Sequence, residues 1–371
     1  MKITLLQENL NKGLSITSHF VSSRAQLPIL SNIALQTKEN RLKISATNLE
    51  VGVNYYCGAK IESEGGTTVL SRTFSEFVSS LPTEKVTLAT KKESLEVSCG
   101  NYQANFPVIP ISDFPEVPTK VNQKITFSYS DFAKAIKNVV FAASGDDSRP
   151  VLSGVHFDFI NQECLLSATD GYRLSFKKIK LTDKYLKEIE FIIPSVILNE
   201  LLRLKPEGEQ SVFELGLANK EKQAVFFLPN LEFSSRLLEG KYPDINKVIP
   251  KGKSTSILIE REEFLGAVKT ASIFARESAN IIKLEIGSGK VKILANAPSL
   301  GENISQVEAK IDGDNQRVAF NFRFLVDLLS NLETDQVIIE MQEPLKPVVF
   351  KNPKDKDFLH IIMPVKIQEE E

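Results

Sequence analysis

Cysteine is scarce in this chain of 371 residues: it occurs three times, as Cys57, Cys99 and Cys164. No two of them have the Cys-x-x-Cys spacing of redox or zinc motifs, and an odd count does not suit a disulfide framework. Free cysteines are typical of a reducing compartment. We therefore expect a cytoplasmic protein without disulfide bonds.

Long hydrophobic runs and excess charge are also missing. The opening "MKITLLQENLNKG" has no apolar stretch of signal-peptide length. No segment approaches the roughly 18 apolar residues of a membrane span, so we expect no membrane partner. The formal net charge is −2, so any surface for nucleic acid has to be local. A composition of 42% hydrophobic and 25% charged residues indicates a globular protein with a sizeable core.

Signatures of catalysis are absent as well. The histidines His19, His156 and His360 lie in separate segments, and no HxxxH or HExxH spacing occurs, so we expect no metal site. There is no GxSxG, Walker loop or GxGxxG. The stretch "GSGK" at 287–290 lies between two strand patterns, which predicts a hairpin turn rather than a phosphate loop. The sequence predicts no catalytic residue and no cofactor.

What the sequence does contain is one plan repeated three times. The segments "LKISATNLEVGV", "LLSATDGYRLSF" and "VKILANAPSLGEN" carry Ala46, Ala168 and Ala295, which are 122 and 127 residues apart. A nearly constant period of this length is a repeat signature. Stretches rich in Pro, Gly, Lys and Ser separate the copies, which predicts domains at 1–121, 122–252 and 253–371.

Each repeat follows the order helix, strands, helix, strands. Apolar residues spaced by three and four predict a first helix in each copy, namely around Leu6, Leu10, Leu14 and Val21, around Phe132, Ile136, Val139 and Ala143, and around Phe264, Val268, Ala271 and Ala275. Second helices are predicted at 71–82, 195–206 and 321–332. Strand patterns outnumber helices, which predicts an α+β fold with two helices per repeat packed on antiparallel sheets.

The segment "SATDGYRLSF" at 167–176 allows two interpretations. Asp170 could be a catalytic acid, with His156 as its partner in a hydrolase. A Thr-Asp-Gly between two strand patterns is also a hairpin signal. The first repeat has Asn48 in the matching place and the third has Asn296, so the pattern persists without the acid. We interpret the segment as a structural turn and keep a hydrolase that uses Asp170 as the alternative.

Five motifs in order resemble one known family: "SRAQLPILSNI" (23–33), "RPVLSGVHF" (149–157), "ATDGYRLSF" (168–176), "LEGKYPDINKVIP" (238–250) and "IIMPVKI" (361–367). They are similar to the beta subunits of bacterial DNA polymerase III, the DNA sliding clamps, and the resemblance covers the whole chain. It implies a non-catalytic processivity subunit. It also implies a head-to-tail homodimer whose six similar domains form a closed ring, with the helices lining a hole for duplex DNA.

The resemblance also implies partners and the residues that meet them. The replicative polymerase, the clamp loader and repair polymerases insert short linear motifs into a cleft, which matches Leu152, Thr169, Gly171, Tyr172, Arg173, Leu174, Pro243, Lys247, Val248, Ile361, Ile362, Met363, Pro364, Val365, Lys366 and Ile367. The expected contacts with double-stranded DNA, which are independent of base sequence, come from Arg24, Arg72, Lys134, Lys137 and Arg149. The dimer is expected to join Phe106 and Val108, on an edge strand, to Ile273 and Phe274, on a helix.

Two features depart from the family pattern. Ser195 and Val196 stand where the family usually has a basic pair, which puts one DNA contact in doubt. The chain also continues as Gln368–Glu371, "QEEE", beyond the usual family end at the position of Ile367. A repeat scaffold that binds proteins and no DNA remains a second alternative, and retention on circular DNA separates it from a clamp.

Overall fold

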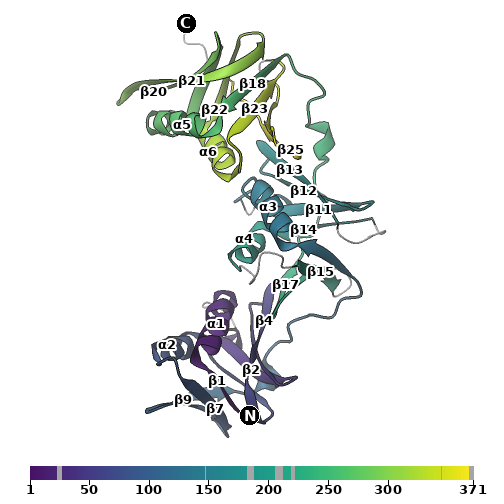
Figure 1. Ribbon diagram of the computed structural model, residues 1–371, viewed down its shortest axis with the longest axis vertical. Coiled ribbons are helices and arrows are strands. Elements are labelled where there is room, and N and C mark those ends of the chain that lie inside the picture. The colour runs from purple at the N-terminus through teal and green to yellow at the C-terminus, as the bar shows by residue number, and fades with distance from the viewer. Residues whose placement is uncertain are drawn as a thin grey trace. The chain divides into compact units, whose positions relative to one another are not determined.

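The computed structural model describes residues 1–22, 27–146, 148–181, 188–204, 212–218, 222–343 and 345–366. These form two compact units, one made of residues 1–129 and 200–237 and the other of residues 130–199 and 238–371. Each unit is built around a long antiparallel sheet with helices packed on it (Figure 1). The α+β class predicted from the sequence is therefore confirmed.

The sheet of the first unit has 13 strands among the described residues. In spatial order they are β10 (Lys124–Ser128), β15 (Val212–Ala218), β16 (Gln223–Leu228), β17 (Leu231–Arg236), β4 (Val51–Gly58), β3 (Arg41–Thr47), β2 (Asn32–Lys38), β6 (Gly66–Leu70), β9 (Tyr102–Ile109), β8 (Ser94–Cys99), β7 (Lys85–Lys91), β1 (Lys2–Leu6) and β5 (Lys60–Ser63). Helices α1 (Gln7–Thr17) and α2 (Ser71–Ser80) pack on it. A Cβ at Gly13 would lie 2.7 Å from Ile44 and Tyr55 side chains, so glycine permits the close approach of α1 to β3 and β4.

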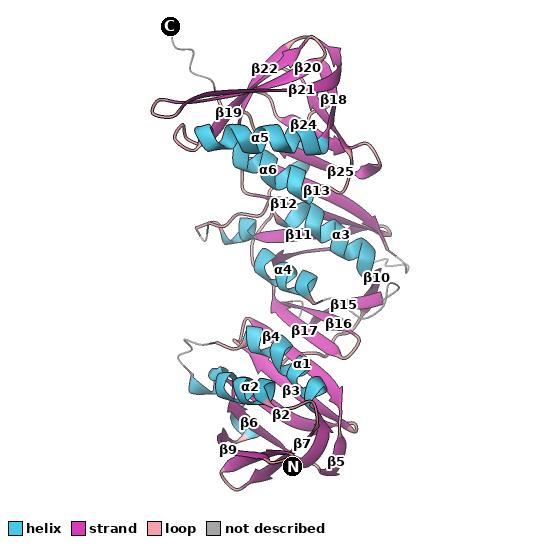
Figure 2. Cartoon of the chain, turned by 60° about the vertical axis from the view of Figure 1, so that its left-hand side comes forward, coloured by secondary structure: helices cyan, strands magenta, loops and turns pink. Residues whose placement is uncertain are grey.

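The sheet of the second unit has 12 strands in the described part of the chain. Their spatial order is β14 (Ile189–Pro194), β11 (Gly154–Ile160), β12 (Glu163–Thr169), β13 (Arg173–Lys180), β25 (Asp355–Ile362), β24 (Val348–Asn352), β23 (Gln336–Met341), β18 (Thr255–Glu260), β21 (Gly301–Gly313), β20 (Lys290–Ala297), β19 (Ile281–Gly287) and β22 (Gln316–Asn321). Helix α3 (Tyr129–Val140) packs Phe132 on Phe157 of β11. Helices α5 (Arg261–Ala275) and α6 (Phe322–Asn331) lie side by side on the C-terminal strands (Figure 2).

The predicted helices exist, with shorter bounds. Leu6 ends strand β1 instead of starting a helix. The strand alternates between its two faces, with Ile3 and Leu5 buried on one face and Leu6 exposed on the other. Val21 and Ala143 lie beyond the ends of α1 and α3. Helix α4 (Ser195–Arg203) ends earlier than predicted, and 205–206 of that prediction fall outside the described residues. The "GSGK" turn is confirmed, since Ser288 and Gly289 both have the positive φ of a tight hairpin.

The sheets continue from one predicted repeat into the next. Strand β4 of the first repeat pairs with β17 of the second, and β13 of the second pairs with β25 of the third. The two compact units therefore each contain part of the second repeat. The borders at 121 and 252 remain a prediction, because this division of the molecule follows the sheets and not the repeats.

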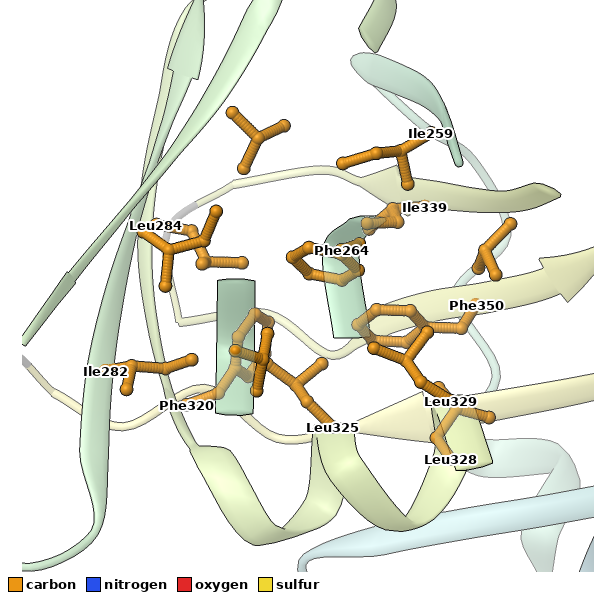
Figure 3. Close-up of a cluster of buried hydrophobic side chains, with 14 of the residues drawn as sticks. Ile259, Phe264, Ile282, Leu284, Phe320, Leu325, Leu328, Leu329, Ile339 and Phe350 are labelled. Atoms are coloured by element: carbon orange, nitrogen blue, oxygen red, sulfur yellow. The ribbon is translucent and has the colours of Figure 1, made fainter. Parts of the chain in front are cut away.

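A dense apolar core supports the C-terminal helices and strands (Figure 3). Phe264 of α5, Leu325 of α6 and Phe320 of β22 are all fully buried there. Their spacing places one face of each helix against the sheet, as the sequence pattern predicts. Burying each such side chain contributes about 1.5–3 kcal/mol, so this core holds α5 and α6 firmly on the C-terminal strands.

The three cysteines are buried and unbridged, as expected. Burial raises the pKa of the Cys57 thiol to about 12, so it is not a reactive thiolate at neutral pH. Within the described residues, no helix combines the length and apolar character that crossing a membrane requires.

His360 is a polar residue in the middle of the second sheet. Its side chain is fully buried on β25, and its Nδ1 lies 2.6 Å from the Ser175 hydroxyl on β13. The ring also contacts Phe141 and Phe350, with ring centroids 5.4 and 6.4 Å away. Burial, followed by the nearby positive charge of Arg173, holds the pKa of His360 well below its usual 6.5.

The buried imidazole predicts acid sensitivity of the fold. Below pH 6.5 the unfolded chain binds a proton at this position that the folded chain does not bind, so stability falls as the pH drops. We expect the urea midpoint to decrease between pH 7.5 and pH 5.5, and to decrease less in His360→Gln than in the wild type. Equal pH slopes in the two proteins would show that His360 does not carry the effect.

Candidate functional site

The Thr-Asp-Gly segment forms a tight turn between β12 and β13. The Thr169 hydroxyl donates to the Arg173 carbonyl at 2.6 Å and accepts the Gly171 N–H at 3.0 Å. The Asp170 Oδ1 accepts the backbone N–H groups of Tyr172 and Arg173 at 2.9 and 3.0 Å. Gly171 has a φ of +94°, a conformation that glycine adopts without strain. The structural interpretation of this segment is confirmed.

The first repeat builds the same turn without an acid. The Thr47 hydroxyl donates to the Val51 carbonyl, and the Asn48 Oδ1 accepts the N–H groups of Glu50 and Val51. The third repeat differs from expectation, because β20 runs through Asn296 to Ala297 and its turn comes afterwards. At the position of Asn48 and Asp170 the turn therefore needs one oxygen acceptor and no carboxylate.

The hydrolase alternative loses support from these contacts. His156 stacks on the Tyr242 ring at 4.7 Å and its Nε2 lies 3.1 Å from Glu190. Both oxygens of Asp170 are already engaged, one by the backbone and one by the Arg173 Nε at 3.0 Å. Neither group is presented as a free acid or base.

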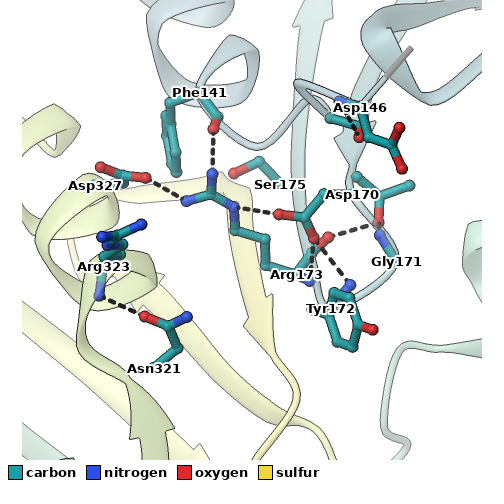
Figure 4. Close-up of polar contacts among 12 residues, drawn as sticks. Phe141, Asp146, Asp170, Gly171, Tyr172, Arg173, Ser175, Asn321, Arg323 and Asp327 are labelled. Atoms are coloured by element: carbon teal, nitrogen blue, oxygen red, sulfur yellow. Dashed lines mark hydrogen bonds and ion pairs between the residues drawn. The ribbon is translucent and has the colours of Figure 1, made fainter. Parts of the chain in front are cut away.

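Arg173 lies at the centre of a polar network (Figure 4). Its side chain is 9% exposed, and its guanidinium donates to Asp170, to Asp327 of α6 at 2.6 Å and to the Phe141 carbonyl at 2.8 Å. The guanidinium also lies 4.8 Å from the centre of the Phe324 ring. Because Asp327 and Phe324 belong to the third predicted repeat, Arg173 links that repeat to the second.

The C-terminal strand joins the turn through backbone hydrogen bonds. Strands β13 and β25 pair antiparallel, with Leu174 opposite Ile361 and Arg173 opposite Ile362. The Met363 N–H then donates to the Tyr172 carbonyl at 2.8 Å. The segment that follows is held by the Val365 N–H, which donates to the Ala319 carbonyl at 2.8 Å. Chain segments far apart in the sequence are therefore fixed beside the turn.

Two small apolar clusters meet at this place. One contains Leu174, Val349 and Ile361, and the other contains Leu152, Ile192 and Tyr242. Ile245 packs against both, so it connects them. We call this region the junction surface, and it is built by residues near 152, from the turn at 169–174, from 242–249 and from 361–365.

The predicted cleft residues occupy different depths of the junction surface. Leu152, Leu174 and Ile361 are buried, and Ile362 belongs to the C-terminal core. Two large side chains remain accessible, namely Tyr172, 61% exposed, and Val248, 41% exposed. The half-buried members are Thr169, Met363, Pro364 and Val365. The other exposed members are Gly171, Pro243, Lys247 and Lys366. Lys247 pairs with Asp244 at 3.4 Å. Ile367 lies outside the described residues.

The predicted DNA contacts are basic and exposed where they are described. Arg72 is 88% exposed and pairs with Glu76, and Lys137 lies 3.7 Å from Glu333. Lys134 and Arg149 are also exposed. Arg24 lies outside the described residues. Of the replaced pair, Val196 is 68% exposed on α4 and carries no charge.

The predicted dimer residues are not equally accessible. Ile273 on α5 is 55% exposed, whereas Phe274 packs partly against the C-terminal core. Phe106 is 8% exposed, because its ring packs edge-on against Phe74 and Phe77. In the described part of the chain, the edge of β9 opposite β8 pairs with β6 only at Val108 and Ile109, so it has no partner strand along Tyr102–Pro107.

Sequence reasoning missed several residues of the junction surface. Tyr242 and Ile245 belong to the motif "LEGKYPDINKVIP", but no periodicity marks which of its residues are buried. Asp327 matches Glu76 and Glu200 in the repeat, yet it alone among these three pairs with a side chain from the neighbouring repeat. The signal that could have found it is an acid on α6 facing an arginine in the preceding repeat.

Comparisons with known proteins agree with this architecture. A curated protein of Staphylococcus epidermidis named "Beta sliding clamp" is 28% identical over 381 residues, which is 99% of each chain. The "Beta sliding clamp" of Bacillus subtilis is also 28% identical and covers 99% of this chain and 100% of its own. The crystal structure of the DNA polymerase sliding clamp from Bacillus subtilis has a TM-score of 0.94 at 26% identity, covering 99% of this chain and 100% of that one.

Family models describe nearly the whole sequence. Models of the N-terminal, central and C-terminal domains of the DNA polymerase III beta subunit match residues 1–118, 126–244 and 246–366. The three occur once each and in the order of their names. This chain therefore belongs to the DNA polymerase III beta subunit family.

Proposed function

We propose that this chain works as a DNA sliding clamp, in which two copies joined head to tail enclose duplex DNA and tether the replicative polymerase. The observation that supports this function best is the match of all three beta-subunit domain models along one chain. A ring holds DNA by enclosing it, so it needs only weak phosphate contacts and no catalytic group. We place the clamp in the cytoplasm and its domain borders near residues 121 and 252.

We propose that partner proteins dock on the junction surface. Short motifs with a glutamine and apolar anchors would contact Tyr172, Val248 and Met363, above the buried floor formed by Leu174 and Ile361. A few apolar anchors usually supply most of the affinity in such contacts. Arg173 then acts by holding the turn and α6 in place, because its guanidinium is engaged by two carboxylates and a carbonyl.

DNA contact is assigned to Arg24, Arg72, Lys134, Lys137 and Arg149. Those that the structure describes are exposed and basic, as phosphate contacts require. Their partial pairing with Glu76 and Glu333 is weak, because exposed ion pairs contribute little and yield to a phosphate. The dimer is assigned to the open edge of β9 with Val108 on one side and to Ile273 with Phe274 on the other, while Phe106 supports β9 from inside.

A ring predicts topological retention on DNA. The loaded protein should remain on nicked circular DNA and dissociate rapidly once the circle is cut, because a linear molecule has free ends. Gel filtration of the complex before and after restriction measures this. Equal release from circular and linear DNA would instead favour a scaffold that does not enclose DNA.

A charge on the junction surface should weaken partner binding. We expect Val248→Asp to weaken a Gln- and Leu/Phe-containing peptide, bound by the wild type near the micromolar range, about −8 kcal/mol, by at least tenfold. Isothermal titration measures the affinity. Val212→Asp is the matched control, since Val212 is also an exposed valine but lies on β15. Equal weakening in both variants would contradict the proposal that the peptide binds at this surface.

A charge at Ile273 should separate the dimer. Because Ile273 is 55% exposed, Ile273→Asp is expected to stay folded and to sediment at the 41.4 kDa of one chain instead of twice that mass. Ile160→Asp is its control, because Ile160 is 36% exposed at the end of β11 of the same unit, in the second repeat. A dimeric Ile273→Asp protein at micromolar concentration would place the interface elsewhere.

A further inference from the structure

The second unit also contains a pocket that is rich in lysine and separate from the junction surface. Its volume is about 390 Å³, and it lies between α3, the end of β13, Glu333 shortly after α6, and the turn between β24 and β25. Five lysines line it, namely Lys134, Lys137, Lys177, Lys180 and Lys354. We call it the lysine pocket.

The lysines of this pocket are only partly neutralised. Lys177 is held by both carboxylate oxygens of Asp355 at 2.8 and 2.7 Å. Lys137 lies 3.7 Å from Glu333, which is a long contact between exposed groups. Lys134 and Lys180 are exposed and make no ion pair within the described part of the chain. Against these five lysines the lining has three carboxylates, those of Asp131, Glu333 and Asp355, so the pocket keeps an excess of positive charge.

The other lining residues favour a phosphodiester over a nucleotide base. Asn138 and Asn352 add amide groups, Asp131 adds a carboxylate beside Lys134, and the apolar lining residue, Ile179, is 8% exposed. Among the described residues, no aromatic ring and no arginine line the pocket, so a base has no surface to stack on and no planar group to pair with. Lysine binds phosphate as a compact point charge and does not distinguish base sequences.

The repeat places a related pocket in the first unit, and its chemistry differs. That pocket has Lys12, Tyr55, Gly58 and Asn230 at the positions of Lys134, Lys177, Lys180 and Lys354. One lysine is shared, and the other three positions are neutral there. The shape of the pocket follows from the repeated fold, whereas the lysine cluster belongs to the second unit alone among the two.

We propose that the lysine pocket holds a phosphate of the DNA backbone, with Lys134 and Lys180 as its principal contacts. The inference rests on the proposed clamp function and deepens it, because it moves the DNA contact of α3 from an open helix face into a defined pocket. The Lys177–Asp355 pair fixes the floor, and Lys134 and Lys180 approach from two elements. A pocket of this kind adds affinity without sequence preference, as a sliding protein requires.

The test uses the full-length dimer and a short fluorescein-labelled duplex. We expect Lys134→Ala with Lys180→Ala to weaken binding about tenfold at low salt and to lower the slope of log K against log salt by about 0.9 for each phosphate that is no longer neutralised. Lys283→Ala with Lys310→Ala removes the same charge from exposed positions on β19 and β21 and is expected to change neither. Replacing Lys134 and Lys180 by arginine should retain most of the affinity.

Three results would overturn the proposal. The first is an unchanged slope and affinity in the Lys134→Ala, Lys180→Ala protein, provided that its circular dichroism and dimer mass match the wild type. The second is equal weakening in both double alanine variants, which indicates net charge alone. The third is a result in which inorganic tripolyphosphate requires Lys134 and Lys180 for binding and the DNA duplex does not. The pocket is then a site for a free anion.

The failure of the clamp function itself is measured separately. Retention of the wild type on nicked circular DNA tests enclosure, and it does not depend on the two lysines. A wild type that is retained on circular DNA, together with a double variant of unchanged salt slope, contradicts the proposal for the lysine pocket and leaves the clamp function supported.

Equal weakening of the double variant on duplexes of unrelated sequence supports a backbone contact, and weakening confined to one sequence contradicts it.

Discussion

The backbone pairing of β13 with β25 is the interaction on which the junction surface depends. It brings Leu174 against Ile361 and sets the Met363 N–H at the Tyr172 carbonyl. A shift by one residue would exchange Ile361, which packs in the junction surface, with Ile362, which packs in the C-terminal core. Both side chains are apolar, so hydrophobicity alone does not fix the register. Ser175 and His360 stand opposite each other and are hydrogen-bonded in an otherwise apolar setting, and this pair favours one alignment.

Arg173 shows that the sequence alone does not reveal which groups a side chain contacts. The family resemblance assigns it to the cleft that binds partner motifs. The structure gives it three acceptors from three segments, and its side chain is nearly buried. A guanidinium in such a place costs desolvation and is stabilised only when every partner is present. The turn, the end of α3 and α6 are therefore organised together, and the accessible part of the surface is left to Tyr172 and its apolar neighbours.

Local patterns predicted much of the fold and less of the site. Helical spacing placed α2, α5 and α6 closely, and the period of about 120 residues revealed the repeat. The Asn48 and Asp170 comparison correctly identified a turn. Alternation of apolar residues tells which face of a strand is buried but not which strand lies beside it, so the continuous sheets through β4–β17 and β13–β25 could not be inferred from it. The bridging role of Ile245 and the Asp327 contact were missed for the same reason, since both depend on partners distant in sequence.

The two matching turns differ in a way that separates shape from connection. An asparagine has one oxygen acceptor, and at Asn48 that oxygen is consumed by the backbone of its own hairpin. An aspartate has two, and at Asp170 the second oxygen is left over for a guanidinium. The exchange of asparagine for aspartate at the same position thus adds one acceptor. Through Arg173, that acceptor connects the turn to Asp327 of the neighbouring repeat. In a protein built of repeated domains, the contact between one pair of repeats can in this way be made stronger than that between another pair, while the two turns keep the same backbone.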